Sequence, residues 1–239
     1  MNATQPVLFP ANPHLPELTL RGCQVAQLAA KAVAEGIQSG STVFCEQVRK
    51  HEEELDSLDR QINEDVTIAV ARGSGTQARE LLACLKFILE LERIGDLLLN
   101  VANRLQTVAP RLQSQDTHDL AHMANILALM LADVTEAFSA RDVKRALEVL
   151  KADAEIDRLR NLLFIRHIEN PGNELRQESF HIVFISQALE RAGDHAKNLA
   201  EEICHLVSGR SVRHILREYD RPAEQVYLER MRRSSHDKP

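Results

Sequence analysis

The sequence predicts an all-α protein made of two tandem three-helix bundles related by internal duplication. Three observations predict this fold class. Aromatic residues make up only 4% of the chain and Trp is absent, which disfavours β-sheets because their pleated surfaces favour aromatic and β-branched residues. No segment sustains the polar-apolar alternation of a strand. The acidic motif LERxGD occurs at residues 91–96 and again at 189–194, so each half of the chain carries one copy.

The first half is expected to form three helices, each bounded by residues that commonly start or stop helices. These helices span residues 18–39, 42–71 and 77–108. Their boundaries are a turn at Ser39-Gly40-Ser41, a break at Gly73-Ser74-Gly75 and Pro110.

The second half repeats this layout. Its helices are expected over residues 116–140, 143–169 and 174–208, with Asp142 as the N-cap of the middle one and a break at Asn170-Pro171-Gly172-Asn173 before the last. The two repeats are therefore assigned to residues 18–110 and 112–209. They lie between an irregular lead-in over 1–17, which holds four prolines, and a basic tail over 210–239.

Aligning the two halves supports the duplication. Residues 52–58 match 153–159, and residues 91–103 match 189–201. On the third helix of each half the apolar residues step by three and four, as in the seam of a helix bundle, and we expect them in the core. They are Cys84, Phe87, Leu91, Ile94, Leu98, Val101 and Leu105, and Ile182, Ile185, Leu189, Ala192, Ala196, Leu199 and Ile203.

Composition and charge narrow the class of protein. The formal net charge of −6 argues against a general nucleic-acid binder. No apolar run approaches the ~20 residues that cross a bilayer, and the N-terminus lacks the basic-then-apolar design of a signal peptide. We therefore expect a cytoplasmic protein. The four cysteines are scattered and form no CxxC pair, so we expect them to be reduced, with Cys84 in the core.

Two pairs of carboxylates lie off the seam in each half, on helices that are expected to be antiparallel neighbours. Residues four apart share one face of a helix. The pairs are Glu52 with Asp56 and Glu92 with Asp96 in the first half, and Asp153 with Asp157 and Glu190 with Asp194 in the second. On the third helices, Asn100 and Asn198 continue the same rows.

A single acidic pair at this spacing is usually a solvated helix face, but here two unfavourable choices occur together, at Gly95-Asp96 and at Gly193-Asp194. Like charges four residues apart cost roughly 0.2–0.5 kcal/mol, and a glycine inside a helix costs about 1 kcal/mol. A bound cation is the simplest compensation, because carboxylate and amide oxygens are ligands for Fe, Mn, Mg and Ca and also bind Zn. The glycines would let another helix, or the ligands of the ion, approach closely.

Several alternatives stay open. The carboxylates could instead pair with Arg93 and Arg191 or with an arginine of a partner. His195 is a candidate nitrogen ligand in the second half alone, because its counterpart is Leu97. The E-x-x-H spacing of di-iron bundles occurs at residues 202–205, but no second copy follows. A metal-dependent helical-bundle enzyme, di-iron or ferritin-like, is therefore the alternative to a non-enzymatic protein.

The doubled L-E-R-x-G-D-x-x-x-N-x-A motif, with an acidic E/D-x-x-x-D pair on the preceding helix, resembles the PhoU family over roughly residues 18–209. The resemblance implies a cytoplasmic, non-enzymatic negative regulator of phosphate uptake. Such a regulator couples a phosphate ABC transporter ATPase to a sensor histidine kinase for phosphate-starvation genes. The resemblance also implies a homodimer, and iron or zinc clusters held by these eight carboxylates: Glu52, Asp56, Glu92, Asp96, Asp153, Asp157, Glu190 and Asp194.

The two copies of the motif are unequal. Family members usually read GDHA; the second copy keeps this as Gly193-Asp194-His195-Ala196, whereas the first continues with Leu97-Leu98. With His195 and Glu202, the second copy is expected to hold metal more firmly. The tail over 210–239 has eight Lys and Arg against five acids. It is expected to form a helix packed on the bundle with a frayed end, in preference to contact with anionic lipid at a membrane surface.

Overall fold

In the computed structural model, residues 14–41, 43–71, 78–169 and 177–209 are described, and their regular elements are all helical. The six long helices are α1 (His14–Ser39), α2 (Phe44–Ala71), α3 (Ala78–Val108), α4 (Ser114–Ala140), α5 (Val143–Phe164) and α6 (Gln177–Ser208). A 3-10 turn, η2 (Ala109–Arg111), follows α3, and a π-helical turn, η3 (Ile165–Glu169), continues α5. The predicted all-α class is confirmed.

The helix boundaries lie within a few residues of the predicted ones, with one correction at the start. α1 begins at His14, so part of the predicted irregular lead-in is helical. Pro16 lies in the first turn, where its missing N–H costs little because the first N–H groups of a helix have no acceptor within it. The rest of the lead-in, both predicted inter-helix breaks and the tail lie outside the described residues: 1–13, 72–77, 170–176 and 210–239.

Two predicted boundaries show the expected local chemistry. Gly40 has φ of 63°, a left-handed conformation that glycine adopts without strain, and its N–H donates to the Gly36 carbonyl at 3.1 Å. Asp142 caps α5, because its side chain accepts hydrogen bonds from the backbone N–H groups of Lys144 and Arg145. The predicted N-cap is confirmed.

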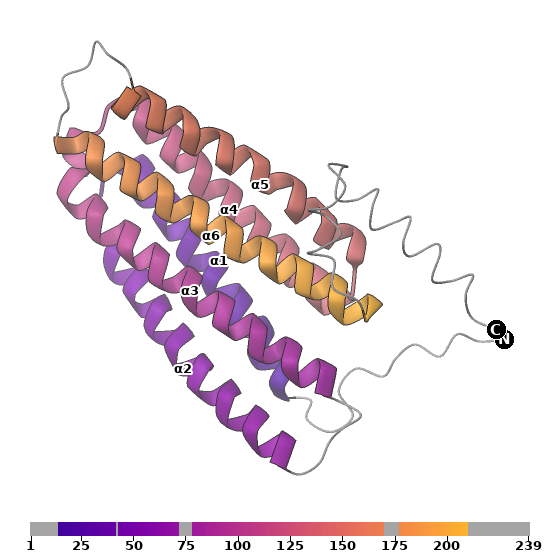
Figure 1. Ribbon diagram of the computed structural model, residues 1–239. Helices are drawn as coiled ribbons and strands as arrows, with labels where there is room; N and C mark the ends of the chain where they lie inside the picture. The colour runs from indigo at the N-terminus through magenta and orange to yellow at the C-terminus, as the bar shows by residue number, and fades with distance from the viewer. Residues whose placement is uncertain (1–13, 42, 72–77, 170–176, 210–239) are drawn as a thin grey trace.

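The helices form two three-helix bundles, α1–α3 and α4–α6, that pack against each other (Figure 1). Helices α2, α3, α6 and α5 lie side by side in one layer, and α1 and α4 pack together behind it. Each bundle thus contributes two helices to the interface, since α1 contacts α4 and α3 contacts α6. The predicted duplication is visible as two similar halves.

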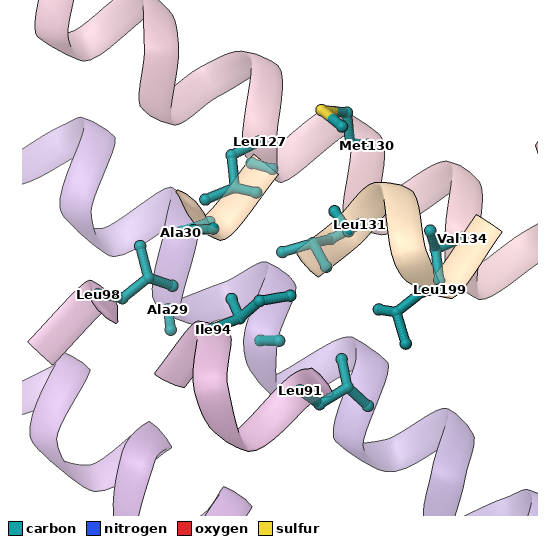
Figure 2. Packing of buried hydrophobic residues seen from close by; sticks show 14 of the residues in the cluster. Ala29, Ala30, Leu91, Ile94, Leu98, Leu127, Met130, Leu131, Val134 and Leu199 are labelled. Atoms are coloured by element: carbon teal, nitrogen blue, oxygen red, sulfur yellow. The ribbon is translucent and has the colours of Figure 1, made fainter. Parts of the chain in front are cut away.

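The apolar core runs without interruption from one bundle into the other. Every predicted seam residue is buried, as are the four cysteines, which are free thiols. Figure 2 shows the place where the bundles meet, where Ala30 of α1 and Ile94 of α3 belong to the same apolar cluster as Leu131 of α4 and Leu199 of α6. The two repeats therefore share one core.

Helix α4 has the length and the apolar composition of a bilayer-spanning segment, the one such helix among the described residues. Half of its most apolar stretch is buried inside the protein, against α1, α5 and α6. Its packing against three other helices accounts for the apolar composition of α4.

Candidate functional site

The glycine of each LERxGD motif lets its helix lie close to the preceding one. A Cβ atom at position 95 of α3 would lie 2.7 Å from Cδ1 of Leu55 on α2. One at position 193 of α6 would lie 3.1 Å from Cδ1 of Ile156 on α5. Both distances are shorter than ordinary van der Waals contact. The predicted close approach of the neighbouring helix is confirmed, and it brings the carboxylates on the two helices near each other.

The first acidic set, which consists of Glu52 and Asp56 on α2 and Glu92 and Asp96 on α3, gathers mutually repelling charges. Burial raises the pKa of Glu52, and the nearby charges of Asp56 and Asp96 raise it further. The pKa of Glu92 is likewise raised, by burial and then by Asp96, although Arg93 opposes the shift. The four predicted residues of this repeat therefore lie near enough for their charges to interact, and their ionised forms repel one another.

The alternative expectation, that the carboxylates of the first set pair with Arg93, is confirmed in part. Nε of Arg93 lies 3.5 Å from Glu92, and Nη1 lies 3.7 Å from Asp96. The Arg93 side chain is 64% exposed, so solvent screens it and the ion pairs contribute little. A fifth carboxylate, Asp59 on α2, lies close enough to raise the pKa of Glu92 further.

The second acidic set, which consists of Asp153 and Asp157 on α5 and Glu190 and Asp194 on α6, has basic partners of its own. Nζ of Lys197 donates to Oδ2 of Asp153 at 2.5 Å and lies 3.7 Å from Oδ1 of Asp194. Nη2 of Arg160 lies 3.4 Å from Oε1 of Glu190. Neither basic residue is among the residues predicted from the sequence.

Lys197 is held in its charged form. Burial would lower the pKa of its ammonium, but the hydrogen bond and negative charge of Asp153 outweigh burial and raise it. Asp153 is itself only 4% exposed, whereas the Lys197 side chain is 35% exposed, so the pair lies at the edge of the buried core. Two cations of the same repeat thus offset part of the charge of the four carboxylates. Burial still raises the pKa of Asp153 and of Glu190, although Lys197 and Arg160 oppose the shifts.

The two extra candidate ligands of the second repeat contact the first repeat instead. Nδ1 of His195 lies 2.5 Å from Oε2 of Glu90 on α3, and that same oxygen accepts a hydrogen bond from Asn198. Glu202 pairs with Lys86 of α3 at 2.9 Å. His195 and Glu202 therefore tie α6 to α3 across the bundle interface.

The side chains of the two acidic sets differ in how well they could hold a metal ion. In the described residues, no three His, Cys, Asp or Glu side chains converge as they stand on a point that could hold a metal. The first set still offers carboxylate oxygens from two adjacent helices, the type of donor that hard metal ions prefer. The second set does not fit, because the Lys197 ammonium lies against its buried carboxylate.

The repeat alignment contained the signal for Lys197 and Arg160. Lys197 stands where the first repeat has Leu99, and Arg160 stands where it has Asp59. The positions at which the two repeats differ, in addition to those at which they agree, therefore identify both residues.

Comparison with known proteins supports the two-repeat architecture. The PhoU domain matches this chain twice, over residues 20–105 and 120–203. The chain is 30% identical over 202 residues to the phosphate-specific transport system accessory protein PhoU homolog of Rhizobium meliloti (strain 1021), covering 80% of this chain and 84% of that protein. It is 29% identical over 214 residues to PhoU homolog 1 of Thermotoga maritima, covering 84% and 91%.

Solved structures share the fold. The crystal structure of PhoU from Pseudomonas aeruginosa superposes with a TM-score of 0.74 at 24% identity, covering 82% of this chain and 96% of that one. The phosphate transport system regulatory protein PhoU from Streptococcus pneumoniae superposes with a TM-score of 0.75 at 20% identity, covering 82% and 95%.

Proposed function

Because the chain belongs to the PhoU family, we propose that it is an accessory protein of phosphate-specific transport that restrains phosphate uptake and phosphate-starvation signalling. The observation that carries the proposal is the match of the PhoU domain to both repeats, together with relatives named as accessory proteins of that transport system. In this role the protein acts by binding partners and carries out no catalysis. Its cytoplasmic location and its homodimeric state stay predictions from the sequence.

The proposed partners are the ATPase of a phosphate ABC transporter and a sensor histidine kinase, and the α3–α6 face offers a contact surface. Near the start of α6, Phe180 and Phe184 lie one turn apart, and each side chain is about half exposed. The Arg104 guanidinium of α3 lies 4.7 Å from the centre of the Phe184 ring, so this face of α6 borders α3. Exposed aromatic and aliphatic groups of this size are typical of protein interfaces.

A pull-down tests the partner proposal. The immobilised chain is expected to retain the transporter ATPase, the cytoplasmic part of the kinase, or both, whereas a Phe180→Ser/Phe184→Ser variant is expected to lose them. The matched control is Leu129→Ser, which removes a more exposed apolar side chain, 67% accessible, from α4. The proposal fails if the wild-type chain retains neither partner and deleting its gene leaves phosphate-responsive expression unchanged.

We also propose that the first acidic set binds iron or zinc. Its carboxylates raise one another's pKa, and their basic neighbour Arg93 is largely exposed, so a bound cation would relieve their repulsion. Oxygen donors from α2 and α3 would surround the ion. A bound ion would supply structural chemistry, clamping α2 to α3 beside Gly95. The E-x-x-H segment gives the enzyme alternative little support, since Glu202 pairs with Lys86 of α3.

Elemental analysis tests metal binding. The purified wild-type chain is expected to contain metal, and a variant with Glu92, Asp96, Glu190 and Asp194 all changed to Ala is expected to contain much less. Equal metal in both proteins, or none in either, would contradict the proposal.

A further inference from the structure

We propose that in the second repeat the Lys197 ammonium, with help from Arg160, takes the place of the metal ion, so that metal binding is confined to the first repeat. This inference deepens the proposed metal-binding function, on which it rests, and it assigns a role to two basic residues that the function did not use.

The position of Lys197 is that of a bridging cation. From α6 it reaches across to Asp153 of α5 at 2.5 Å while remaining 3.7 Å from Asp194 of its own helix. It therefore links the same two helices that an ion in this set would link. Arg160 makes the complementary contact from α5 to Glu190 of α6 at 3.4 Å. Together the two side chains supply two formal positive charges, which equals the charge of one divalent ion.

The first repeat has the opposite charge pattern at the equivalent positions. Leu99 stands in place of Lys197 and supplies no charge, and Asp59 stands in place of Arg160 and adds a negative one. The basic residue seen beside the first set, Arg93, is largely exposed and no closer than 3.5 Å. The first set consequently has an excess of negative charge that a metal ion would neutralise.

Metal binding to the second set would be opposed by two costs. An incoming cation would have to break the hydrogen bond that the Lys197 ammonium donates to the buried Asp153 carboxylate. The displaced ammonium, still carried by α6 one turn after Asp194, would also repel the metal, because like charges repel. Hence Lys197 both satisfies the carboxylates and excludes the ion.

This inference reverses the expectation that the second copy of the motif holds metal more firmly. That expectation depended on His195 and Glu202 as extra ligands. In the structure both side chains pair with residues of α3, and neither supplements the second acidic set.

The test measures Zn²⁺ retained by the purified full-length chain, by elemental analysis after equilibration with zinc sulfate and desalting. A Glu92→Ala/Asp96→Ala variant is expected to lose the zinc, and a Glu190→Ala/Asp194→Ala variant to keep the wild-type amount. Loss of the wild-type zinc on changing the second set would overturn the inference while leaving metal binding itself intact.

The decisive variant removes the two basic side chains, as Lys197→Gln with Arg160→Asn. It is expected to bind zinc beyond the wild-type level and to lose the gain when Glu190→Ala and Asp194→Ala are added. Lys86→Gln, which removes another lysine paired with a glutamate, is the matched control and is expected to gain none. No gain in the decisive variant refutes the role of Lys197, whatever the wild-type chain binds.

The two proposals can fail separately. If the wild-type chain binds no zinc but the Lys197→Gln/Arg160→Asn variant does, the role of Lys197 stands and metal binding by the first repeat fails. If circular dichroism shows that this variant is unfolded, Leu99→Lys tests the same idea in the first repeat. It is expected to abolish zinc binding there, and full retention of zinc would overturn the inference.

Discussion

Gly95 allows α2 and α3 to lie close together because, having no Cβ atom, it leaves room for the buried side chain of Leu55. A Gly95→Leu substitution would force this contact apart, and overpacking a core typically costs about 1–3 kcal/mol. The better helix propensity of Leu recovers less than about 1 kcal/mol of this. We therefore expect a lower midpoint of urea unfolding.

The control for Gly95→Leu is Asn103→Leu, an exposed position on the same helix, where a change within about 0.5 kcal/mol is expected. Adding Leu55→Ala to Gly95→Leu should restore part of the lost stability by making room. If Gly95→Leu unfolds at the wild-type urea concentration, close packing at this glycine is not needed for the fold.

Asp142 stabilises the start of α5 through two backbone N–H groups. Asp142→Ala is expected to lower the free energy of unfolding by about 1 kcal/mol, which in a protein of this size lowers Tm by about 2–4 °C. Asp142→Asn should retain most of the stability because its amide oxygen also accepts from the N-terminal N–H groups. Glu64→Ala, at an exposed position inside α2, is the control. Equal Tm values for Asp142→Ala and Glu64→Ala would argue against the cap.

At the scale of elements, an ion-pair network holds η3 against the first turns of α4. Arg166 of η3 donates to the buried Asp116 at 2.8 Å and to Asp119 at 2.7 Å. His167 lies 3.0 Å from Asp116 and 3.2 Å from Ser179 of α6. One π-helical turn thus connects the starts of α4 and α6 at one end of the second bundle.

The free energy of unfolding should depend on pH through this network. Burial would raise the pKa of Asp116, but the hydrogen bonds from His167 and Arg166 outweigh burial and hold it below the ordinary value of 3.8. The native state therefore binds the proton less readily than the unfolded state. The network's contribution is complete above pH ~4 and is lost as the pH falls through the lowered native pKa.

Arg166→Met tests this network. It leaves Asp116 without one of its donors, and we expect a loss of about 2 kcal/mol at pH 7, less than for a fully buried pair because Arg166 is partly exposed. Chemical denaturation from pH 7 to pH 2 should show the wild-type and variant stabilities converging in acid. Arg158→Met, which removes an exposed ion pair, is the control and should change little. A constant difference at all pH values would contradict the assignment.

At the scale of the whole molecule, the continuous core predicts that both repeats unfold together. Leu131 of α4 is fully buried where the bundles meet (Figure 2), so Leu131→Ala is expected to cost about 2–5 kcal/mol. Leu129→Ala, on the exposed face of the same helix, should be nearly neutral.

Labelling of buried thiols in increasing urea can follow the unfolding of each repeat separately. Cys23 lies in the first repeat and Cys204 in the second, and burial raises the pKa of each to about 12, so both resist labelling in the folded state. Labelling in increasing urea should expose the two cysteines at one midpoint, and Leu131→Ala should shift both equally. Two separate midpoints would show that the repeats unfold independently.

Local patterns were sufficient for much of the fold. Apolar spacing placed Leu91, Leu98 and their counterparts in the core, and Asp142 marked a helix start, because helix periodicity and capping depend on residues near in sequence. The start of α1 differs from the predicted one, because the proline-rich composition favours an irregular segment whereas a helix tolerates Pro16 in its first turn. The merging of the two bundles into one core depends on contacts between α1 and α4 and between α3 and α6, which no local pattern encodes.

The sequence by itself determined the duplication, the helical class and the pairing of carboxylates such as Glu92 with Asp96, because these follow from identity and spacing along one helix. Only the tertiary structure decided which charges meet. Lys197 lies far from Asp153 in the chain yet contacts it, and His195 turns to Glu90 of the other repeat. Electrostatic interactions depend on distance in space and on burial, and so the two copies of one motif came to have different surroundings.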